Sequence, residues 1–538
     1  MPFILNVLIF FWLIRTVKFV LFWIYLWQLK EYHTGRFLDH FRTHKGKKIF
    51  FNFLFISKLI LLIVLLFFDG LFLLTFYLLL LVYFAESAFF VYGFIKNKFK
   101  RPVFTAKTIF LTVCSLIFTT SFLFKTYGLN NNFSFTSSIL IFDIFTPLIV
   151  SFLILFLQPF FVLARNIILK KAKGKILEYK KLTVIGITGS YGKTSTKEFL
   201  TTVLSSKFSV LSTKDHQNSE IGIAQCILNN LNENHQIFLV EMGAYNKGGI
   251  KLLCDIVKPK IGVVTGVNQQ HLAIFGSMEN LLLAEGGREL LKSLPDNGMI
   301  VINGDNKYCI NLYKSAEIKK KIYSLHNDKI DSDIWTEDII VEKKSLSFIV
   351  MTREKEIAYF DINILGKQNV QNILGVILVA KELGMSLEEI SRACQNIKPA
   401  QAGITLKKGV HGIDIIDSSY SSNPNGVMAD LDHLNTFPQK KVIIMPCLIE
   451  LGNKSAEIHR EIGKKIAEVC DMAIITTKER FEEIKNGAME NGMPKDRILL
   501  CDKPKDIFNM VTTFCKSRDT VLLEGRVPNE LVELLVSK

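Results

Sequence analysis

The residues best placed to do chemistry lie together in one segment, Val184–Lys197, which reads Val-Ile-Gly-Ile-Thr-Gly-Ser-Tyr-Gly-Lys-Thr-Ser-Thr-Lys. An apolar strand that ends in a glycine-containing loop, with a helix starting at Lys193, directs backbone N–H groups and the positive helix end at a phosphate group. In such a loop Lys193 neutralises β- and γ-phosphate charge, and the Thr194 hydroxyl binds Mg²⁺. The predicted nucleotide-binding residues of the loop are Thr188, Gly189, Ser190, Tyr191, Gly192, Lys193, Thr194 and Ser195.

The loop departs from the generic phosphate-loop pattern at one position. That pattern has a glycine six residues before the lysine, and this chain has Ile187 there. A chance Gly-Lys-Thr in a strand–helix turn is the alternative interpretation. The order of strand, loop and helix favours nucleotide binding over chance.

The variant Thr-Gly-Ser-x-Gly-Lys-Thr resembles the Mur ligase family, and the resemblance covers roughly residues 181–538. The motifs Asp417–Pro424 and Glu450–Gly452 are most like those of the members that add D-Ala-D-Ala to a UDP-MurNAc-tripeptide. Several ordered motifs together are far more specific than any one of them. The matching segments are Thr213 with Asn218 and Ile221-Gly222, Glu241–Ala244, His271-Leu272 with Phe275–Ser277, Asn303–Asn306, Gly366–Asn372, Asp417–Pro424, and Glu450–Gly452 with His459 and Gly463.

The resemblance implies ATP-dependent amide-bond formation with ATP and Mg²⁺ as cofactors. A substrate carboxylate would attack the γ-phosphate of ATP and become an acyl phosphate. An amine would then attack the acyl carbon and expel phosphate. The resemblance also implies a P-loop α/β central domain over residues 181–400 and a Rossmann-like C-terminal domain over residues 401–538.

The same resemblance gives roles to residues outside the loop. With Thr194, the carboxylate of Glu241 would bind one Mg²⁺, and the imidazole of His271 would bind a second. The implied catalytic residues are therefore Lys193, Glu241, His271 and Glu285. Asn369 and Asn372 are assigned to the nucleotide base or to the loop around it, and Asp417 is assigned to the ribose of the nucleotide or to the incoming amine. Thr213, Asn218, Tyr420 and Asn423 are assigned to substrate binding.

Glu285 is included because of a missing lysine. Family members commonly carry a carbamylated lysine soon after the histidine, but here no lysine lies between His271 and Lys292. Glu285, in Ala284-Glu285-Gly286, stands where the family has Ala-Lys-Gly. We hypothesise that Glu285 presents the carboxylate without needing CO₂. An exposed acid on a helix face is the alternative.

Other departures fall mainly in the parts that would hold the base and the amine. An arginine usual near Gly403 is missing, so the identity of the amine follows less directly than the ATP chemistry. The substituted positions are Gly266 for Asn, Ser418 for an acid, Ser421 for Asn, Cys447 for Asp, and Glu524-Gly525-Arg526 for Lys-Gly-Ser.

Short β-rich runs that alternate with helical patterns must position these residues. This alternation predicts βαβ units and a mainly parallel sheet, with hairpin-like strands in the less regular region 308–365. Helices are expected at Asn369–Leu383 and Ser386–Gln395. The predicted strands are Leu182–Thr188, Ser209–Thr213, Ile237–Glu241, Lys260–Thr265, Ile413–Asp417, Lys441–Met445, Met472–Thr476 and Thr520–Leu523.

Residues 1–165 form a different, apolar part with four to five predicted membrane spans. Each long run approaches or exceeds the roughly 20 residues that a helix needs to cross about 30 Å of hydrocarbon. Met1–Leu29 is ambiguous, since Arg15 and Lys18 would each cost roughly 2.5–3.5 kcal/mol at the bilayer centre. It either spans with these groups facing other helices or lies in the interface. The four clear runs are Ile49–Phe68, Leu71–Ile95, Phe104–Phe124 and Ile139–Ala164.

Charge predicts the orientation of these spans. The segments 30–48, 96–101 and 165–181 are rich in Lys and Arg, whereas 69–70 and 127–138 carry none. The positive-inside rule places the three basic segments, and everything after Arg165, in the cytoplasm of a multi-pass plasma-membrane protein. Much of the net charge of +15 is thereby explained, which argues against a nucleic-acid partner. Glu86 and Asp143 lie inside the predicted spans, where carboxylates often mark a functional site. We give them little weight as functional residues, because acids near helix ends can reach water.

Together these observations predict a membrane-anchored ligase of peptidoglycan precursor synthesis, with a membrane part where the family has a UDP-binding domain. The acceptor would be UDP-linked or lipid-linked, and the amine D-Ala-D-Ala or a related amino acid or dipeptide. A ligase like poly-γ-glutamate synthase is the runner-up. An ATP-driven transporter or sensor, or a nucleotide-binding scaffold without activity, are the alternatives of another class.

Overall fold

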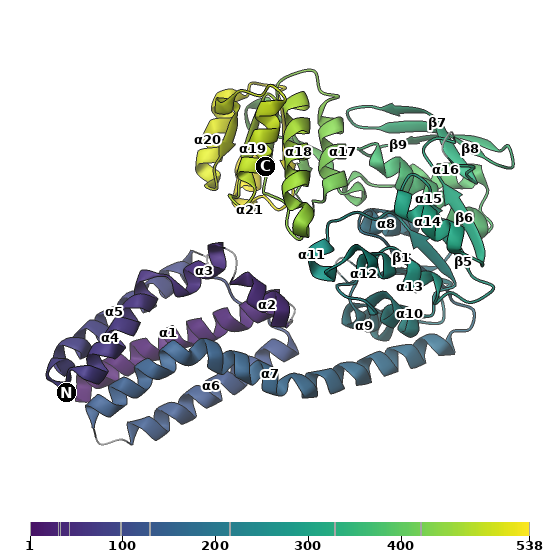
Figure 1. Ribbon diagram of the computed structural model, residues 1–538. Coiled ribbons are helices and arrows are strands. Elements are labelled where there is room, and N and C mark those ends of the chain that lie inside the picture. The colour runs from purple at the N-terminus through teal and green to yellow at the C-terminus, as the bar shows by residue number, and fades with distance from the viewer. Residues whose placement is uncertain are drawn as a thin grey trace. The chain divides into compact units, whose positions relative to one another are not determined.

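The computed structural model describes residues 2–30, 32, 34–41, 44–96, 99–128, 131–214, 217–327, 330–419 and 422–536. The chain divides into two compact units, Met1–Asn166 and Ile167–Lys538. The first unit is helical, and the second contains two β-sheets with helices around them (Figure 1).

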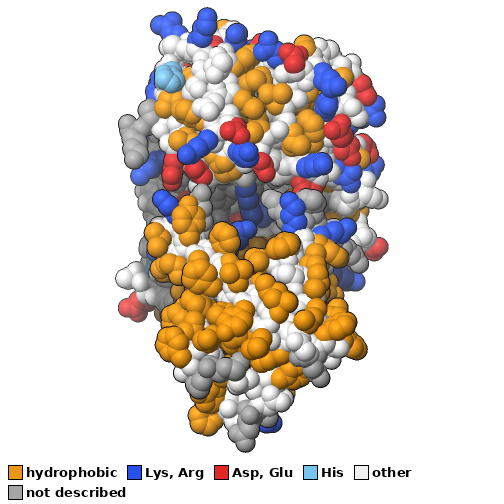
Figure 2. All heavy atoms as spheres, turned by 90° about the vertical axis from the view of Figure 1, so that its left-hand side faces the viewer, with side chains coloured by type: hydrophobic (Ala, Val, Ile, Leu, Met, Phe, Trp, Pro, Cys, Tyr) orange, Lys and Arg blue, Asp and Glu red, His pale blue; other side chains and the backbone are white. Residues whose placement is uncertain are grey.

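The first unit is built from long apolar helices. Among the described residues, four helical segments are long and apolar enough to cross a membrane, namely Phe3–Leu29, Phe72–Ile95, Ala106–Tyr127 and Asn132–Glu178. Figure 2 shows apolar side chains crowded over the surface of this unit, and several phenylalanines there, such as Phe53 and Phe152, are largely exposed. Apolar side chains that face outward suit hydrocarbon rather than water. The helices are α1 (Pro2–Leu29), α2 (Thr34–His40), α3 (His44–Phe50), α4 (Phe53–Phe67), α5 (Phe72–Ile95), α6 (Ala106–Tyr127) and α7 (Asn132–Glu178).

The expectation of a single helix over Ile49–Phe68 is wrong. The helix breaks at Phe51–Asn52, because the Asn52 side chain accepts a hydrogen bond from the Phe55 amide and caps a new helix, α4. At 15 residues, α4 is roughly 22 Å long, which is short of the roughly 30 Å of a bilayer core. The ambiguous N-terminal segment, in contrast, is one continuous helix of 28 residues.

A cluster of buried charges joins four helices of the first unit. Arg15 of α1 pairs with Glu86 of α5 (Nε–Oε2, 3.2 Å) and with Asp143 of α7. Lys58 of α4 pairs with the same two carboxylates at 2.5 Å and 2.9 Å. None of the four side chains is more than 14% exposed. Two cations and two anions leave the cluster neutral, which offsets the cost of burying each charge. The expectation that Glu86 and Asp143 reach water near helix ends is wrong, because both acids are paired with cations of neighbouring helices.

We expect Asp143→Leu to destabilise the protein, because Arg15 and Lys58 would then share one carboxylate. Breaking a buried ion pair from one side typically costs about 3–5 kcal/mol. The double variant Lys58→Met/Asp143→Leu restores neutrality and should recover most of the loss, while Lys125→Met changes only an exposed lysine and serves as the control. Thermal unfolding of the purified full-length protein in detergent measures the effect. Equal losses in the single and double variants would contradict this account.

The second unit begins with a nine-stranded sheet in the order β2-β3-β1-β4-β5-β6-β7-β8-β9. The first six strands are parallel, and β7 to β9 form antiparallel hairpins. The strands are β1 (Thr183–Thr188), β2 (Val210–Ser212), β3 (Ile237–Glu241), β4 (Ile261–Val264), β5 (Met299–Asn303), β6 (Lys319–Tyr323), β7 (Ile334–Val341), β8 (Leu346–Thr352) and β9 (Ile357–Ile362).

Helices cover both faces of this sheet, because its central strands are apolar on both sides. Ile185 of β1 belongs to one core cluster, with residues of α8 and α15, while the adjacent Val184 belongs to the other, with residues of α9 and α10. Leu169 and Ile176 near the end of α7 are buried in that second cluster, so the unit starts before the predicted residue 181. The helices are α8 (Lys193–Leu204), α9 (Glu220–Asn230), α10 (Gly249–Val257), α11 (Leu272–Phe275), α12 (Met278–Leu283), α13 (Arg288–Leu291), α14 (Lys307–Ser315), α15 (Gln368–Glu382) and α16 (Leu387–Cys394).

A six-stranded sheet follows in the order β10-β11-β15-β12-β13-β14, parallel except for β10. The predicted α/β class and all eight predicted strands are confirmed within one or two residues at each end, whereas β5, β10 and β14 were not predicted. The elements are β10 (Thr405–Lys408), β11 (Asp414–Ser418), α17 (Pro424–Leu434), β12 (Lys441–Met445), α18 (Ser455–Val469), β13 (Met472–Ile475), α19 (Phe481–Glu490), β14 (Ile498–Leu500), α20 (Pro504–Phe514), β15 (Thr520–Glu524) and α21 (Asn529–Leu535).

Candidate active site

The loop between β1 and α8 requires its two glycines. Gly189 and Gly192 have φ of +141° and +79°, where a side chain is strained. A Cβ on Gly189 would lie 2.3 Å from the Thr265 hydroxyl oxygen, and one on Gly192 would lie 2.6 Å from Asn372 Oδ1. Ile187, in contrast, is a fully buried residue within β1, so the position at which the generic pattern fails belongs to the strand and not to the tight turn.

Lys193 lies over the loop at the start of α8. Its Nζ donates to the carbonyl oxygens of Gly189 (2.5 Å) and Ser190 (3.4 Å). The backbone N–H groups at the start of α8 add positive potential at the same place. This arrangement gives the loop the charge and the donors that a nucleotide phosphate requires.

Thr194, in the first turn of α8, meets Glu241 at the end of β3. The Thr194 hydroxyl donates to Glu241 Oε1 (3.1 Å), and the Asn218 amide approaches the same oxygen at 3.4 Å. Thr213 supports this carboxylate from behind, because its hydroxyl accepts from the Glu241 amide N–H (3.2 Å) and its carbonyl accepts from the buried Lys197. A hydroxyl and a carboxylate are hard oxygen ligands of the kind that Mg²⁺ prefers.

Glu285 connects the loop to His271. Its Oε2 accepts from the Ser190 hydroxyl, and its Oε1 lies against His271 Nδ1, both at 2.8 Å. The alternative of an exposed helix-face acid is wrong, since Glu285 is 2% exposed and follows the end of α12. Burial acts to raise the pKa of Glu285, but Lys193 and the contacts to His271 and Ser190 outweigh it, so the pKa lies below its ordinary value. The carboxylate is therefore ionised at neutral pH.

The donor set fits Mg²⁺ as a partner of bound phosphate. Among the described residues, no group of three or more His, Cys, Asp and Glu is placed to hold a metal ion. Mg²⁺ commonly needs only one or two protein ligands, because phosphate oxygens and waters complete its octahedron. Thr194 with Glu241 fits one such ion, and His271 offers a nitrogen to a second.

Asn369 and Asn372 brace the loop from α15. The Thr196 hydroxyl donates to Asn372 Oδ1 (3.3 Å), and the Asn372 amide donates to Asn369 Oδ1 (3.0 Å). Both side chains are buried. Asn372 lies beside the loop, since its Oδ1 would be 2.6 Å from a Cβ on Gly192, and Asn369 supports Asn372 from behind. Contact of either residue with the nucleotide base stays a prediction.

The loop that follows β4 reaches the six-stranded part of the unit. The Asn268 amide donates to Asn423 Oδ1 (3.1 Å), and the Gln270 amide donates to the Ser422 carbonyl (3.2 Å). Asn423 also caps α17. Asn268 and Gln270 were not predicted, and the signal that could have found them is their position directly after a buried parallel strand. Predicted Tyr420 lies outside the described residues.

Asp417 lies at the end of β11 and is held locally. Lys407 Nζ donates to its Oδ2 (2.6 Å), and the Ser419 amide donates to its Oδ1 (3.1 Å). Burial acts to raise the pKa of Asp417, but the hydrogen bonds from Lys407 and Ser419 outweigh burial. The pKa therefore lies below its ordinary value, and the carboxylate is ionised. Its assigned contact with the nucleotide or the amine stays a prediction.

Gly266 is explained by its neighbour Tyr191. A Cβ on Gly266 would lie 2.3 Å from the tyrosine ring, and the Tyr191 hydroxyl accepts from the Asn306 amide (3.2 Å). The ring occupies the space that the family's asparagine side chain would need. Glycine replaces the family's asparagine at position 266 because the ring of Tyr191 leaves no room for a side chain there.

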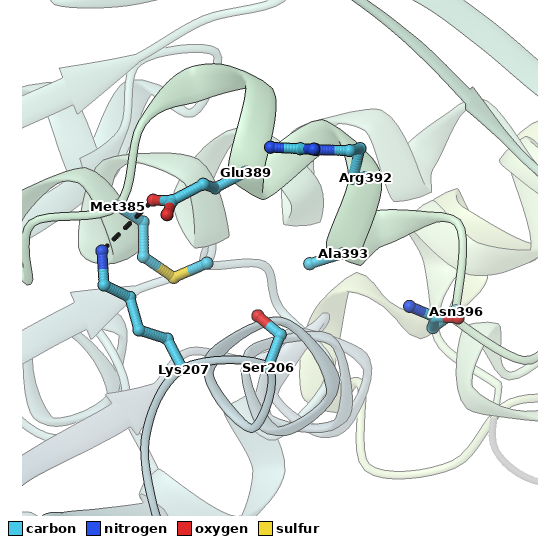
Figure 3. A pocket seen from close by; sticks show the side chains of 7 residues that line it. All are labelled: Ser206, Lys207, Met385, Glu389, Arg392, Ala393 and Asn396. Carbon is cyan, nitrogen blue, oxygen red and sulfur yellow. Dashed lines mark hydrogen bonds and ion pairs between the residues drawn. The ribbon is translucent and has the colours of Figure 1, made fainter.

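A surface hollow lies at the far end of α8 from Lys193. Figure 3 shows Lys207 and Glu389 approaching each other across it (3.2 Å), with Arg392 on the neighbouring helix α16. Since the loop residues are absent from its lining, this hollow is not the nucleotide site.

Comparison with known proteins agrees with the geometry. Residues 187–380 match the Mur ligase middle domain, and residues 404–527 match the Mur ligase, glutamate ligase domain. The UDP-N-acetylmuramoyl-tripeptide–D-alanyl-D-alanine ligase of Bacillus subtilis (strain 168) is 28% identical over 354 residues, covering 65% of this chain and 75% of that protein. The ligase of the same name from Escherichia coli (strain K12) is 26% identical over 281 residues, covering 52% of this chain and 61% of its own length.

Two solved structures share the fold of the second unit. MurF from Acinetobacter baumannii gives a TM-score of 0.61 at 22% identity, covering 69% of this chain and 80% of that one. MurF ligase from Thermotoga maritima in complex with ADP gives a TM-score of 0.60 at 25% identity, covering 69% of this chain and 83% of that one. The two domain families together match more than half of the 538 residues, and the chain belongs to the Mur ligase family.

Proposed function

We propose that this protein is a membrane-anchored, ATP-dependent ligase that forms an amide bond on a peptidoglycan precursor, adding D-Ala-D-Ala or a related amine. The observation that carries the proposal is the convergence of Lys193, the Thr194–Glu241 pair and the His271–Glu285 pair on one loop. The similarity to D-Ala-D-Ala-adding ligases over both domains supports the choice of amine.

The loop residues suit the first half of such a reaction. A carboxylate oxygen of the acceptor attacks the γ-phosphorus of ATP, the bond to the β-phosphate oxygen breaks, and ADP leaves. Lys193 and the loop N–H groups stabilise the negative charge on the phosphoryl oxygens. Mg²⁺ held by Thr194 and Glu241, and by His271, would add charge neutralisation that lets two anions approach.

The second half requires an amine beside the acyl phosphate. The amine nitrogen attacks the acyl carbon, phosphate leaves, and the nitrogen loses a proton as the amide forms. The contacts of Asn268 and Gln270 with the segment Ser422–Asn425 bring the six-stranded part next to the loop that follows β4. The Asn268 carbonyl oxygen in turn lies 3.5 Å from the Ser190 hydroxyl of the phosphate loop. This closeness supports a role for that part in presenting the amine.

The apolar helices of the first unit support anchoring in the plasma membrane, with the ligase unit in the cytoplasm as the basic segments indicate. A membrane part where the family has a UDP-binding domain favours an acceptor presented at the membrane surface. A lipid-linked precursor is therefore proposed beside the UDP-linked one.

Lys193→Ala should lower ATP-dependent phosphate release by roughly 100-fold or more, as removal of one preorganised donor commonly does. Phosphate release and the binding of a fluorescent ATP analogue with Mg²⁺ are the measurements. Lys207→Ala, which changes an exposed lysine beyond the other end of α8, is the control. Unchanged binding and turnover in Lys193→Ala would refute a nucleotide role for the loop.

Glu285→Gln keeps the size of the side chain but removes the charge that orients His271. We expect ligation to slow by roughly 10- to 100-fold and the Mg²⁺ concentration for half-maximal rate to rise. Glu279→Gln, on the exposed face of α12, should behave as wild type. Full ligation with an unaltered Mg²⁺ dependence would show that Glu285 does not replace the carbamylated lysine.

The substrates are identified by offering the purified full-length protein ATP, a panel of D- and L-amino acids and dipeptides, and both UDP-linked and lipid-linked acceptors. Phosphate release and product mass are read together. We expect a product heavier than the acceptor by one D-Ala-D-Ala unit or a related amine. A polymer of glutamate would favour the runner-up activity, and phosphate release independent of every acceptor would argue against a ligase.

A further inference from the structure

A short segment of the six-stranded part rests on α11, directly beside His271. The Ala273 amide donates to the Glu450 carbonyl (3.0 Å), and a Cβ on Gly452 would lie 3.5 Å from the Ala273 amide nitrogen. Glu450 has φ of +69°, a left-handed conformation that is strained for a residue with a side chain. The segment between β12 and α18 therefore holds Glu450 in a strained conformation at this contact.

The Glu450 carboxylate faces the free nitrogen of His271. Its Oε2 lies 4.0 Å from His271 Nε2 and is about one-third exposed. Among the described residues, this carboxylate makes no hydrogen bond, and the imidazole is the only basic group within 4.0 Å of it. A distance of 4.0 Å is too long for a direct hydrogen bond.

The other side of the imidazole fixes which nitrogen is free. Glu285 Oε1 lies 2.8 Å from His271 Nδ1, so Nε2 is the ring nitrogen that faces Glu450 and remains open to a metal ion. A carboxylate on the second ring nitrogen is the usual support of a metal-binding histidine. The pair His271–Glu285 is thus arranged as a ligand and its orienting group.

The gap between Nε2 and Glu450 Oε2 has the width of one small ion. Two bonds of about 2.1 Å on opposite sides of an octahedral ion span about 4.2 Å. A lone imidazole is a weak ligand for a hard cation, whereas one carboxylate with phosphate oxygens and waters is a common Mg²⁺ environment.

We propose that Glu450 is a ligand of the second Mg²⁺, the ion assigned to His271, and that this metal site is completed across the contact between the two sheet-bearing parts of the ligase unit. The inference rests on the proposed function, because the ion is the partner of the nucleotide and the acyl phosphate. It adds a residue from the six-stranded part to a site otherwise formed by the nine-stranded part.

Mn²⁺ is the probe, since it is paramagnetic and accepts the same oxygen ligands. The full-length protein in detergent is titrated with Mn²⁺ in the presence of ADP, and electron paramagnetic resonance counts the ions bound per chain. Wild type should bind two. Glu450→Gln and Glu450→Asn should weaken the second ion by roughly 10- to 100-fold and leave ADP affinity and the first ion unchanged.

Glu450→Asp keeps a carboxylate on a residue that tolerates positive φ, so it should retain more of the second site than Glu450→Asn, which has the same shape without the charge. Glu457→Gln, an exposed acid on α18, is the matched control. Thermal unfolding of each variant establishes that it is folded.

Three results would overturn the inference. Wild type binding only one Mn²⁺ with ADP, or variants with an unaltered second site, would exclude Glu450 as a ligand. A slower reaction in Glu450→Gln with unchanged Mn²⁺ binding would assign Glu450 to an ion pair with His271 instead. A wild-type protein that binds neither ADP nor Mn²⁺ would refute the proposed function itself, and this inference with it.

Discussion

One buried carboxylate, that of Glu285, holds the site together. It accepts from Ser190 in the phosphate loop and orients His271, while Lys193 lies close enough to lower its pKa. A negative charge in a buried position is stable only when such partners surround it. The loop, the histidine and the lysine are therefore tied to one another through Glu285, and the choice of glutamate at this position determines the electrostatics of the whole loop.

The same constraint applies to the buried charges of the helical first unit. Arg15, Lys58, Glu86 and Asp143 come from four helices, and each is buried because the others neutralise it. Ion pairs of this kind add little stability over apolar packing, but they penalise every arrangement in which a charge loses its partner. The cluster thus fixes how α1, α4, α5 and α7 face one another.

Features that depend on local sequence could be predicted, and features that depend on distant contacts could not. Apolar runs predicted the strands, and glycine spacing predicted the phosphate loop. Motif order pointed to Glu285, because this glutamate stands where the family has a lysine. The pairing of Asp143 with Lys58 joins residues far apart in the chain, and periodicity contains no information about it. The same holds for Asn268 and Glu450, whose roles depend on how the two sheets of the ligase unit meet. The break before α4 was missed because a single asparagine cap interrupts an otherwise apolar run.

The departures in the six-stranded part have a common physical logic. Ser418 and Glu524 are neighbours at the ends of β11 and β15, and the Ser418 hydroxyl donates to the buried Asp430 (2.5 Å). Burial raises the pKa of Glu524 well above its ordinary value and also raises that of Asp430, so protonated carboxyl groups are favoured there. Where the family motif has an acid and a lysine, this chain has the hydroxyl of Ser418 and the buried acid Glu524, whose pKa is raised by burial. The exchange keeps the buried cluster free of unpaired charge but changes the polar groups beside Asp417, which is assigned to the nucleotide or the amine. The phosphate-loop residues Lys193 and Thr194 follow the family motif, and the residues beside Asp417 depart from it together. The ATP chemistry of the family therefore transfers to this chain more directly than the identity of its amine.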